Sequence, residues 1–231
     1  MATQKTVPIL VFDVNETLLD ITSLEPLFER LFGNRAVLRE WFAQLILYSQ
    51  SMTLAGLYSP FGELAVGTLR MLATIHEQPL GDSDIAELKT LMGSMPAHPD
   101  VVPALSRLRA AGLRMVTLSN SASAASPTPL ERAGLGEFFE QSFSVEAVGQ
   151  FKPAPETYQH VAQALGVATP DLCLIACHLW DTLGAQAAGC HAALLTRPGN
   201  ALLPAAGVPA PELVAAELGS LAEQILQRWG A

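Results

Sequence analysis

The sequence predicts an α/β fold in which a Rossmann-like parallel sheet carries an inserted helical subdomain. Short apolar runs rich in branched side chains alternate with segments of helical periodicity, a pattern typical of a parallel sheet with helices on both faces. The alternation fails once, between about residues 19 and 95, where only helical periodicity is present. The simplest account of this interruption is a group of helices inserted after the first strand.

Five apolar runs are expected to form buried strands, because each is short and rich in β-forming residues. They occupy residues 8–13, 113–120, 141–148, 172–177 and 191–196. Helical segments lie between them and end at glycines, which commonly terminate helices. These segments run from 99 to Gly112, from 155 to Gly166 and from 181 to Gly189.

The interrupting region is expected to form four consecutive helices. They cover residues 23–32, 35–52, 61–76 and 82–95. This organisation predicts a core domain of residues 1–18 and 97–231 and a helical cap subdomain of residues 19–96, with hinges near Leu19 and near Pro96 to Pro99. Helices that cover the mouth of an α/β sheet can shield a reaction from water.

Composition excludes several classes of function. Half of the 231 residues are apolar, and the net charge of −9 leaves no basic stripe for a nucleic-acid backbone. No apolar run approaches the roughly 20 residues that span a bilayer, and the N-terminal residues lack a signal-peptide pattern. We therefore expect a soluble, cytoplasmic protein with neither nucleic-acid nor membrane partners. The three cysteines form no CxxC pairs, so neither a disulfide framework nor a zinc site is indicated.

Polar residues gather where the predicted strands end. They are Asp13, then Ser119 and Asn120, then Lys152, and finally His178, Trp180 and Asp181. Ligands of open parallel sheets bind beyond the carboxyl ends of the strands, so these side chains are expected at one edge. Singly, each has an ordinary explanation: an aspartate after a strand is often a turn former, and a lone histidine is often structural.

The order of the motifs is more specific than any single residue. FDVNETL (12–18), TLSNS (117–121), FKPAPETY (151–158) and ACHLWDTLGAQAAG (176–189) resemble the four motifs of the haloacid dehalogenase superfamily, and the resemblance covers nearly the whole chain. It implies a haloacid-dehalogenase-like core with a cap. It also implies that Asp13 is the nucleophile, Thr17 its support, Ser119 the second-motif hydroxyl and Lys152 the third-motif lysine. Tyr158, on the next helix, is expected among the substrate-binding residues.

These residue types suit the implied roles. An ammonium beside a carboxylate keeps it ionised, so Lys152 would lower the pKa of Asp13 and orient it for attack. Ser119 and Thr17 offer hydroxyls to an anionic group or a developing charge. Asp181 could hold Lys152 or position water.

The sequence departs from the phosphatases of this superfamily at two places. Asn15 occupies the position of their second aspartate, and an amide cannot serve as a general acid. Ala176-Cys177 replaces the usual Gly-Asp pair, and a thiol is a poor ligand for magnesium. The chain resembles the 2-haloacid dehalogenase branch more closely, which needs no metal or other cofactor. This resemblance implies hydrolytic dehalogenation of a short 2-haloalkanoic acid through an aspartyl ester.

The same resemblance implies a substrate site. Asn120 and Trp180 match residues that cradle the halide, Ser119 would bind the substrate carboxylate, and Phe61 matches an aromatic residue that walls the pocket. Asn15 stands where the branch usually has tyrosine, and His178 where it usually has asparagine; we expect His178 to face the pocket. Phe42 occupies the position of a cap arginine, and Arg39, one helical turn earlier, is a candidate to replace that arginine.

Two other functions stay open at this point. One is a magnesium-dependent small-molecule phosphatase of the same fold, and the other is a ligand-binding protein without turnover. Asn15 and Cys177 argue against the first, whereas Asp13, Ser119 and Lys152 argue against the second. The expected partner is a small organic acid, and the resemblance is compatible with a homodimer.

Overall fold

A computed structural model describes residues 7–122 and 127–230 and contains a six-stranded, fully parallel sheet. The strands are β1 (Ile9–Phe12), β2 (Met115–Ser119), β3 (Gln141–Ser144), β4 (Leu172–Ala176), β5 (His191–Leu195) and β6 (Leu213–Ala215). Their order in the sheet is β3-β2-β1-β4-β5-β6. The predicted α/β fold with a parallel sheet is confirmed.

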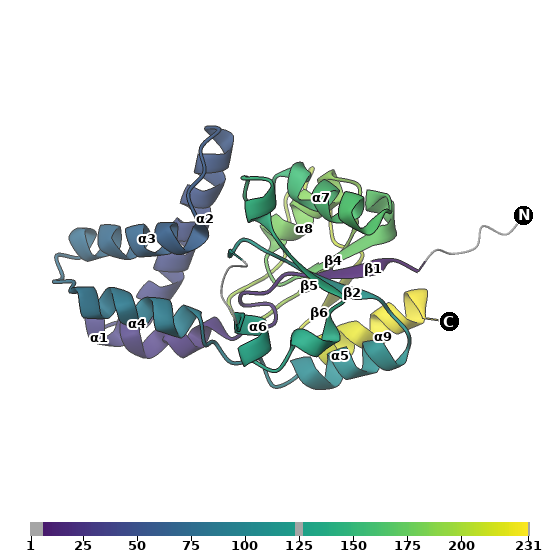
Figure 1. Ribbon diagram of the computed structural model, residues 1–231, viewed down its shortest axis with the longest axis horizontal. Helices are drawn as coiled ribbons and strands as arrows, with labels where there is room; N and C mark the ends of the chain where they lie inside the picture. The colour runs from purple at the N-terminus through teal and green to yellow at the C-terminus, as the bar shows by residue number, and fades with distance from the viewer. Residues whose placement is uncertain (1–6, 123–126, 231) are drawn as a thin grey trace, which may run out of the picture.

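Helices cover both faces of this sheet. The core helices are α5 (Val101–Ala110), α6 (Pro129–Arg132), α7 (Pro155–Leu165), α8 (Leu179–Ala187) and α9 (Leu218–Trp229). Figure 1 shows α7 and α8 on one side of the sheet and α5 and α9 on the other. Short 3-10 turns are η1 (Ile21–Leu24), η2 (Gly136–Phe138), η3 (Val145–Ala147) and η4 (Thr169–Asp171).

The sheet contains one strand more than the sequence pattern predicted. Strand β6 is only three residues long and partly buried, which leaves no strong apolar run to detect. Helix α9, which packs against β6, was also not predicted. The run predicted at 141–148 is a strand only to Ser144, because the Ser144 hydroxyl accepts from the Glu146 N–H at 3.1 Å and starts a 3-10 turn.

The inserted helices form a separate cap beside the sheet, as predicted (Figure 1). They are α1 (Glu25–Phe32), α2 (Val37–Leu54), α3 (Phe61–Ile75) and α4 (Asp82–Met92). The cap has its own apolar centre, in which the Trp41 ring lies 5.4 Å from Phe28 and donates to the Ala65 carbonyl at 3.0 Å. The two connections to the core pair with each other, since the Asp20 N–H donates to the Pro96 carbonyl at 2.7 Å.

Strand β1 lies at the point where the chain changes direction across the sheet. It pairs with β2 on one side and with β4 on the other, and its four side chains are buried. In such sheets the crevice beyond the carboxyl end of the central strand is the usual ligand site. Asp13 is the first residue beyond β1.

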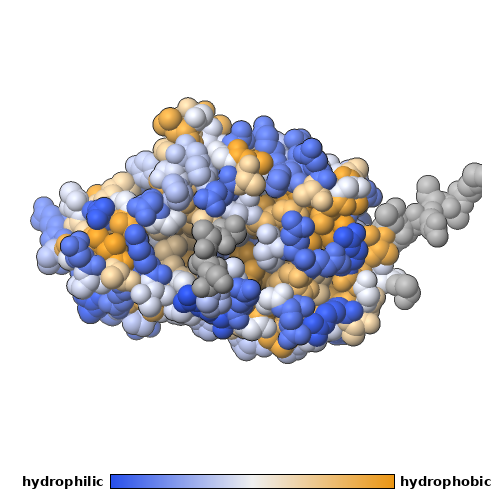
Figure 2. Space-filling model, viewed as in Figure 1, coloured by the Kyte–Doolittle hydropathy of each residue, from blue (hydrophilic) through white to orange (hydrophobic). Residues whose placement is uncertain are grey.

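The surface carries small hydrophobic patches on both domains, separated by hydrophilic side chains (Figure 2). Across residues 7–122 and 127–230, every helix is too short or too polar to cross a bilayer.

Candidate active site

Asp13 lies at the centre of a buried polar cluster, with 5% of its surface exposed. Its N–H donates to the Ile175 carbonyl at 3.0 Å, which ties the residue to β4. One carboxylate oxygen, Oδ1, accepts from Lys152 Nζ at 2.8 Å, and the other, Oδ2, accepts from the Thr17 hydroxyl at 2.6 Å. The Thr17 oxygen in turn accepts from the Cys177 N–H at 2.9 Å. Residues from three motifs thus converge on one carboxylate.

Lys152 is fully buried and links two carboxylates. Its Nζ lies 2.8 Å from Asp13, 2.6 Å from Asp181 Oδ2 and 3.0 Å from the Leu118 carbonyl. The Asn120 side-chain oxygen accepts from the Lys152 N–H at 3.1 Å, so Asn120 fixes the lysine loop. A buried ammonium is stable here because three acceptors satisfy it.

Close packing of the lysine loop on α8 requires a glycine. A Cβ atom at Gly184 would lie 2.4 Å from the Cβ of Pro153, closer than packed atoms can approach. Gly184 therefore lets the loop that carries Lys152 reach the helix that carries Asp181.

Tyr158 orients Asp181 through a buried hydrogen bond. Its hydroxyl donates to Asp181 Oδ1 at 2.6 Å, and the side chain is buried among core residues. Tyr158 is expected among the substrate-binding residues, but it lies where it can orient the Asp181 carboxylate, and it borders no open cleft.

The pKa values of these groups follow from burial and from their partners. Burial alone would raise the pKa of Asp13, but the Lys152 ammonium and His178 outweigh it and lower that pKa far below its ordinary value. Burial would lower the pKa of Lys152, but Asp13 and Asp181 raise it. Burial raises the pKa of Asp181, with the Lys152 ammonium opposing the shift. At neutral pH Asp13 is therefore an ionised, oriented carboxylate.

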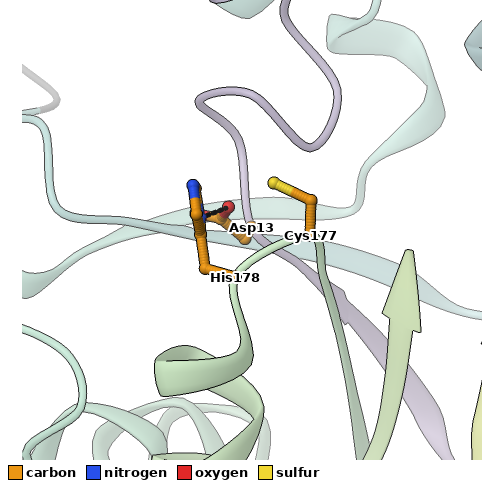
Figure 3. A group of neighbouring side chains, drawn as sticks. All are labelled: Asp13, Cys177 and His178. Carbon is orange, nitrogen blue, oxygen red and sulfur yellow. Dashed lines mark hydrogen bonds and ion pairs between the residues drawn. The ribbon is translucent and has the colours of Figure 1, made fainter. Parts of the chain in front are cut away.

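His178 joins the cluster from the second position after β4, directly before α8. Figure 3 shows its ring and the Asp13 carboxylate pointing toward one another. Nδ1 lies 3.3 Å from Asp13 Oδ2, and Nε2 lies 2.9 Å from a carboxylate oxygen of Glu16. Burial would lower the pKa of His178, but its hydrogen bonds to Asp13 and Glu16 raise it well above its ordinary value. The ring is thus held between Asp13 and Glu16.

Glu16 is the site residue that sequence reasoning missed. It lies between Asn15 and Thr17 in a left-handed conformation, with φ of 64°, and is 2% exposed. Its second carboxylate oxygen accepts from Arg39 and from Asn200 Nδ2, the latter at 2.9 Å. The sequence offered one signal for Glu16, which is an acidic residue within the motif that follows a buried strand. If the loop is buried, such a carboxylate must have hydrogen-bonding partners.

Two aromatic rings stack on His178. The centroid of the Phe42 ring, from the cap, lies 5.3 Å from that of the imidazole, and the centroid of the Trp180 ring lies 5.1 Å from it. Lys152 Nζ lies 5.9 Å from the Trp180 ring centroid. The position expected for a cap arginine is thus filled by a ring that packs on His178.

Two further predicted residues, Asn15 and Phe61, lie where the cap meets the core. Phe61 packs on Phe151 with their ring centroids 6.0 Å apart. Asn15, Phe42 and Phe61 border the same nearly filled space of about 10 Å³. The Asn15 amide donates to the Ser121 hydroxyl at 3.2 Å.

Arg39, the candidate to replace the cap arginine, borders a cleft together with Glu16 and does not border the small space lined by Phe42. Its guanidinium donates to Glu16 and, at 2.9 Å, to the Pro198 carbonyl, and 40% of its side chain is exposed. The reason is electrostatic, since the buried Glu16 carboxylate attracts the Arg39 guanidinium to the Nε2 side of His178.

Two clefts border residues of the cluster or their neighbours in the chain. The cap cleft, about 370 Å³, is bordered by Asn15, Met92, Met95, Ser119, Ser121 and Phe143. The hinge cleft, about 780 Å³, is bordered by Glu16, Asp20, Arg39, His98, Asp100 and Arg197. Asp13 borders neither, because the closed cap leaves its side chain only 7% exposed. Ser119 is the predicted catalytic residue that borders the cap cleft, and its hydroxyl oxygen accepts from the Ser121 N–H at 3.0 Å.

Asp13, Cys177 and His178 place potential metal-binding atoms within 4.8 Å of one another (Figure 3). This set does not fit magnesium, which requires oxygen ligands. Burial raises the pKa of the Cys177 thiol, so the sulfur is protonated at neutral pH. Both ring nitrogens of His178 already face carboxylates.

Comparison with known proteins identifies the family to which this geometry is similar. The family model of the haloacid dehalogenase-like hydrolases matches residues 7–189. The (S)-2-haloacid dehalogenase H-109 of Pseudomonas putida is 26% identical over 219 residues, which cover 94% of this chain and 97% of that protein.

Solved structures share the whole architecture. The L-2-haloacid dehalogenase RSc1362 superposes with a TM-score of 0.89 and 30% identity, over 95% of this chain and 99% of that one. The L-2-haloacid dehalogenase of Xanthobacter autotrophicus, with chloropropionic acid covalently bound, superposes with a TM-score of 0.85 over 97% of this chain and 100% of that one. At 24% identity, this second likeness concerns the fold.

Proposed function

The chain belongs to the haloacid dehalogenase-like hydrolases, and on this premise we propose that it hydrolyses short 2-haloalkanoic acids to 2-hydroxy acids. The observation that carries the proposal is the environment of Asp13. This carboxylate is ionised and held by Lys152 and Thr17, while the neighbouring positions that would serve phosphate chemistry hold Asn15 and Cys177.

In the first step, Asp13 attacks carbon two of the substrate. A bond forms between a carboxylate oxygen and carbon two as the carbon–halogen bond breaks, and the halide leaves with the bonding electrons. Lys152 keeps the nucleophile ionised and oriented by its 2.8 Å contact with Oδ1. The developing halide charge is small and diffuse, so neutral donors such as Asn120 and the edge of Trp180 are suited to receive it.

In the second step, water attacks the carbonyl carbon of the aspartyl ester. The bond between that carbon and the ester oxygen, which came from Asp13 and is now bound to carbon two, breaks; this releases the 2-hydroxy acid and regenerates Asp13 with an oxygen from water. One water proton ends on the product hydroxyl, and the other leaves the site as H⁺. Asp181 supports this step through Lys152, 2.6 Å away, and Tyr158 fixes Asp181.

Substrate binding is proposed to occur at the cap side of Asp13. Ser119 borders the cap cleft and offers a hydroxyl to the substrate carboxylate. Asn15 and the rings of Phe42 and Phe61 form the cap-side wall. Because Asp13 is nearly covered, the cap has to move for substrate to enter and product to leave.

One panel of substrates separates this proposal from a phosphatase. Chloroacetate, bromoacetate, fluoroacetate and both enantiomers of 2-chloropropionate are compared with phosphate monoesters, each with magnesium and with EDTA. We expect halide release that is unchanged by EDTA, because no step relies on a divalent cation to neutralise phosphoryl oxygens. Asp13→Asn is the matched control for background hydrolysis. Phosphate release that requires magnesium, without halide release, would contradict the proposal.

A homodimer and a cytoplasmic location remain predictions from the resemblance and the composition. Analytical ultracentrifugation tests the first directly.

A further inference from the structure

The acidic residue that the sequence motifs did not single out, Glu16, is fully engaged within the fold. Its N–H donates to the Leu19 carbonyl at 2.8 Å, and its carbonyl lies 3.0 Å from His98 Nε2. One carboxylate oxygen meets Arg39 and Asn200, and the other meets His178. A left-handed glutamate is uncommon, and here every one of its polar groups has a partner. The local fold is therefore built to hold this carboxylate at one place.

The Glu16 carboxylate is held at Nε2 of His178, the ring nitrogen that does not face Asp13. Glu16 Oε2 lies 2.9 Å from Nε2, and the opposite nitrogen, Nδ1, points at Asp13 Oδ2 from 3.3 Å. The rings of Phe42 and Trp180 also stack on the imidazole, which restricts its rotation. Glu16 thus decides which protons the ring carries, because a carboxylate on Nε2 keeps a proton there.

The charges around the ring favour the doubly protonated form. The groups that face it are Asp13 and Glu16 as carboxylates, Cys177 as a neutral thiol, and the rings of Phe42 and Trp180. The nearest cations are Lys152, which contacts Asp13, and Arg39, which contacts Glu16. The cluster contains three buried carboxylates, those of Asp13, Glu16 and Asp181, but only one buried ammonium, that of Lys152. Their charges are balanced if His178 is an imidazolium and the partly exposed Arg39 is counted as the third cation.

We propose that Glu16 is a positioning residue that keeps the Nδ1–H of His178 directed at Asp13 Oδ2, so that His178 and Thr17 form the two donors for the oxyanion of ester hydrolysis. The inference rests on the proposed dehalogenase function. It assigns Oδ1 to the ester bond and Oδ2 to the carbonyl, because Oδ2 is the oxygen that meets both donors.

Hydrolysis of the ester passes through an intermediate with four bonds at Cγ of Asp13. Water oxygen bonds to Cγ, the Cγ–Oδ2 double bond becomes a single bond, and the negative charge on Oδ2 is received by the Thr17 hydroxyl and the His178 imidazolium. Collapse of this intermediate breaks Cγ–Oδ1, and Oδ1 leaves as the hydroxyl oxygen of the product. One water proton goes to that oxygen, and the other is lost from the new carboxyl group.

Glu16→Gln tests the role of the carboxylate with little change in size. Without the charge on Nε2, the ring more readily loses a proton, and a neutral ring with its proton on Nε2 presents a bare Nδ1 to the ester. The rate constant of ester hydrolysis is expected to fall increasingly as pH rises from 5 to 9, by about 100-fold at pH 9, whereas the wild-type rate constant stays level. Formation of the ester, measured from the first turnover, is expected to change far less.

The decisive experiment is acid-quenched intact-mass spectrometry during turnover of 2-bromopropanoate. The Glu16→Gln protein should accumulate the ester on Asp13 at pH 9, and Glu16→Asp, which restores the carboxylate, should reduce that accumulation. Glu40→Gln is the matched control, because Glu40 contacts His76 at 3.0 Å on the cap surface, and it should behave as wild type.

Each outcome decides the inference. A loss by the same factor at every pH, or turnover of Glu16→Gln without ester accumulation at pH 9, would overturn the role of Glu16 while leaving the dehalogenase function intact. If the wild-type protein forms no ester and releases no halide from any haloacid, the proposed function itself fails. Thermal unfolding of each variant identifies any protein that has lost its fold.

Discussion

Two glutamate–histidine pairs in this molecule have nearly the same geometry and very different surroundings. In the cap, His76 Nε2 lies 3.0 Å from Glu40, with about a third of each side chain or more open to solvent. Below the cap, His178 Nε2 lies 2.9 Å from Glu16, and both side chains are at least 95% buried. The two pairs have nearly the same contact distance. They differ in burial, and in that the second ring nitrogen of His178 faces a further carboxylate, that of Asp13.

The comparison shows where a charge pair acquires a chemical role. Solvent screens the Glu40–His76 pair, and exposed pairs of this kind contribute little to stability. The Glu16–His178 pair is unscreened and faces a third carboxylate, Asp13, so each proton in it alters the charge at the predicted nucleophile. Predictions that break one pair and spare the other test this difference.

The largest expected loss of activity comes from substitution of Asp13, the carboxylate that faces His178. Asp13→Asn should reduce halide release to background, because an amide is not a nucleophile at neutral pH. The substitution preserves the size of the side chain, so the fold should persist. Halide electrode assays with 2-chloropropionate, together with circular dichroism, measure both. Retained turnover in a folded variant would move the nucleophile elsewhere.

A smaller effect is expected from His178. His178→Asn retains an amide donor and should keep much of the activity, whereas His178→Ala leaves Asp13 Oδ2 with the Thr17 hydroxyl alone and should lose about 100-fold in kcat. His76→Ala, which breaks the exposed pair, is the control and should leave kcat unchanged. Equal kcat in all four proteins would remove His178 from the chemistry.

Stability should separate the pairs over a defined pH window. Burial would raise the pKa of Glu16, but His178 and Arg39 lower it below 4.5, so its stabilising contribution is lost as pH falls. The pKa of His178 is raised well above 6.5, so its contribution is complete below that pH and is lost as pH rises through the raised value.

The buried pair should therefore stabilise the fold most between pH 4.5 and 6.5. In that window Glu16→Gln is expected to cost about 3 kcal/mol of unfolding free energy, because it removes one partner of a buried pair. Glu40→Gln should cost less than about 1 kcal/mol. Urea unfolding at several pH values measures both, and equal losses would show that burial does not distinguish the pairs.

The sequence predicted much of this architecture because its signals are local. The alternating apolar and helical segments fixed the parallel sheet, and the motifs placed Asp13, Ser119, Lys152 and Asp181 at strand ends before any contact was known. Strand β6 escaped because an edge strand of three partly buried residues carries no distinctive pattern.

The site's charge network was less predictable because it depends on contacts between distant segments. Glu16 and His178 are 162 positions apart, and neither spacing nor composition indicates that they meet. Arg39 illustrates the same limit, since helical periodicity placed it beside Phe42 but could not reveal that Glu16 would attract its guanidinium to the hinge cleft. Tyr158 was associated with the site, whereas its support of Asp181 became visible only from the packing of α7 against α8.

The most direct test of the central claim, that Asp13 forms a covalent ester, is a single turnover in oxygen-18 water with enzyme in excess over 2-chloropropionate. Water attacks the carbonyl carbon of the ester, so the first label should enter the Asp13 carboxylate and be absent from the 2-hydroxy acid. Peptide mass spectrometry locates that label, and later turnovers should transfer it to product. Label in the product of the first turnover, with an unlabelled Asp13, would contradict the account, since water would then have attacked the substrate directly.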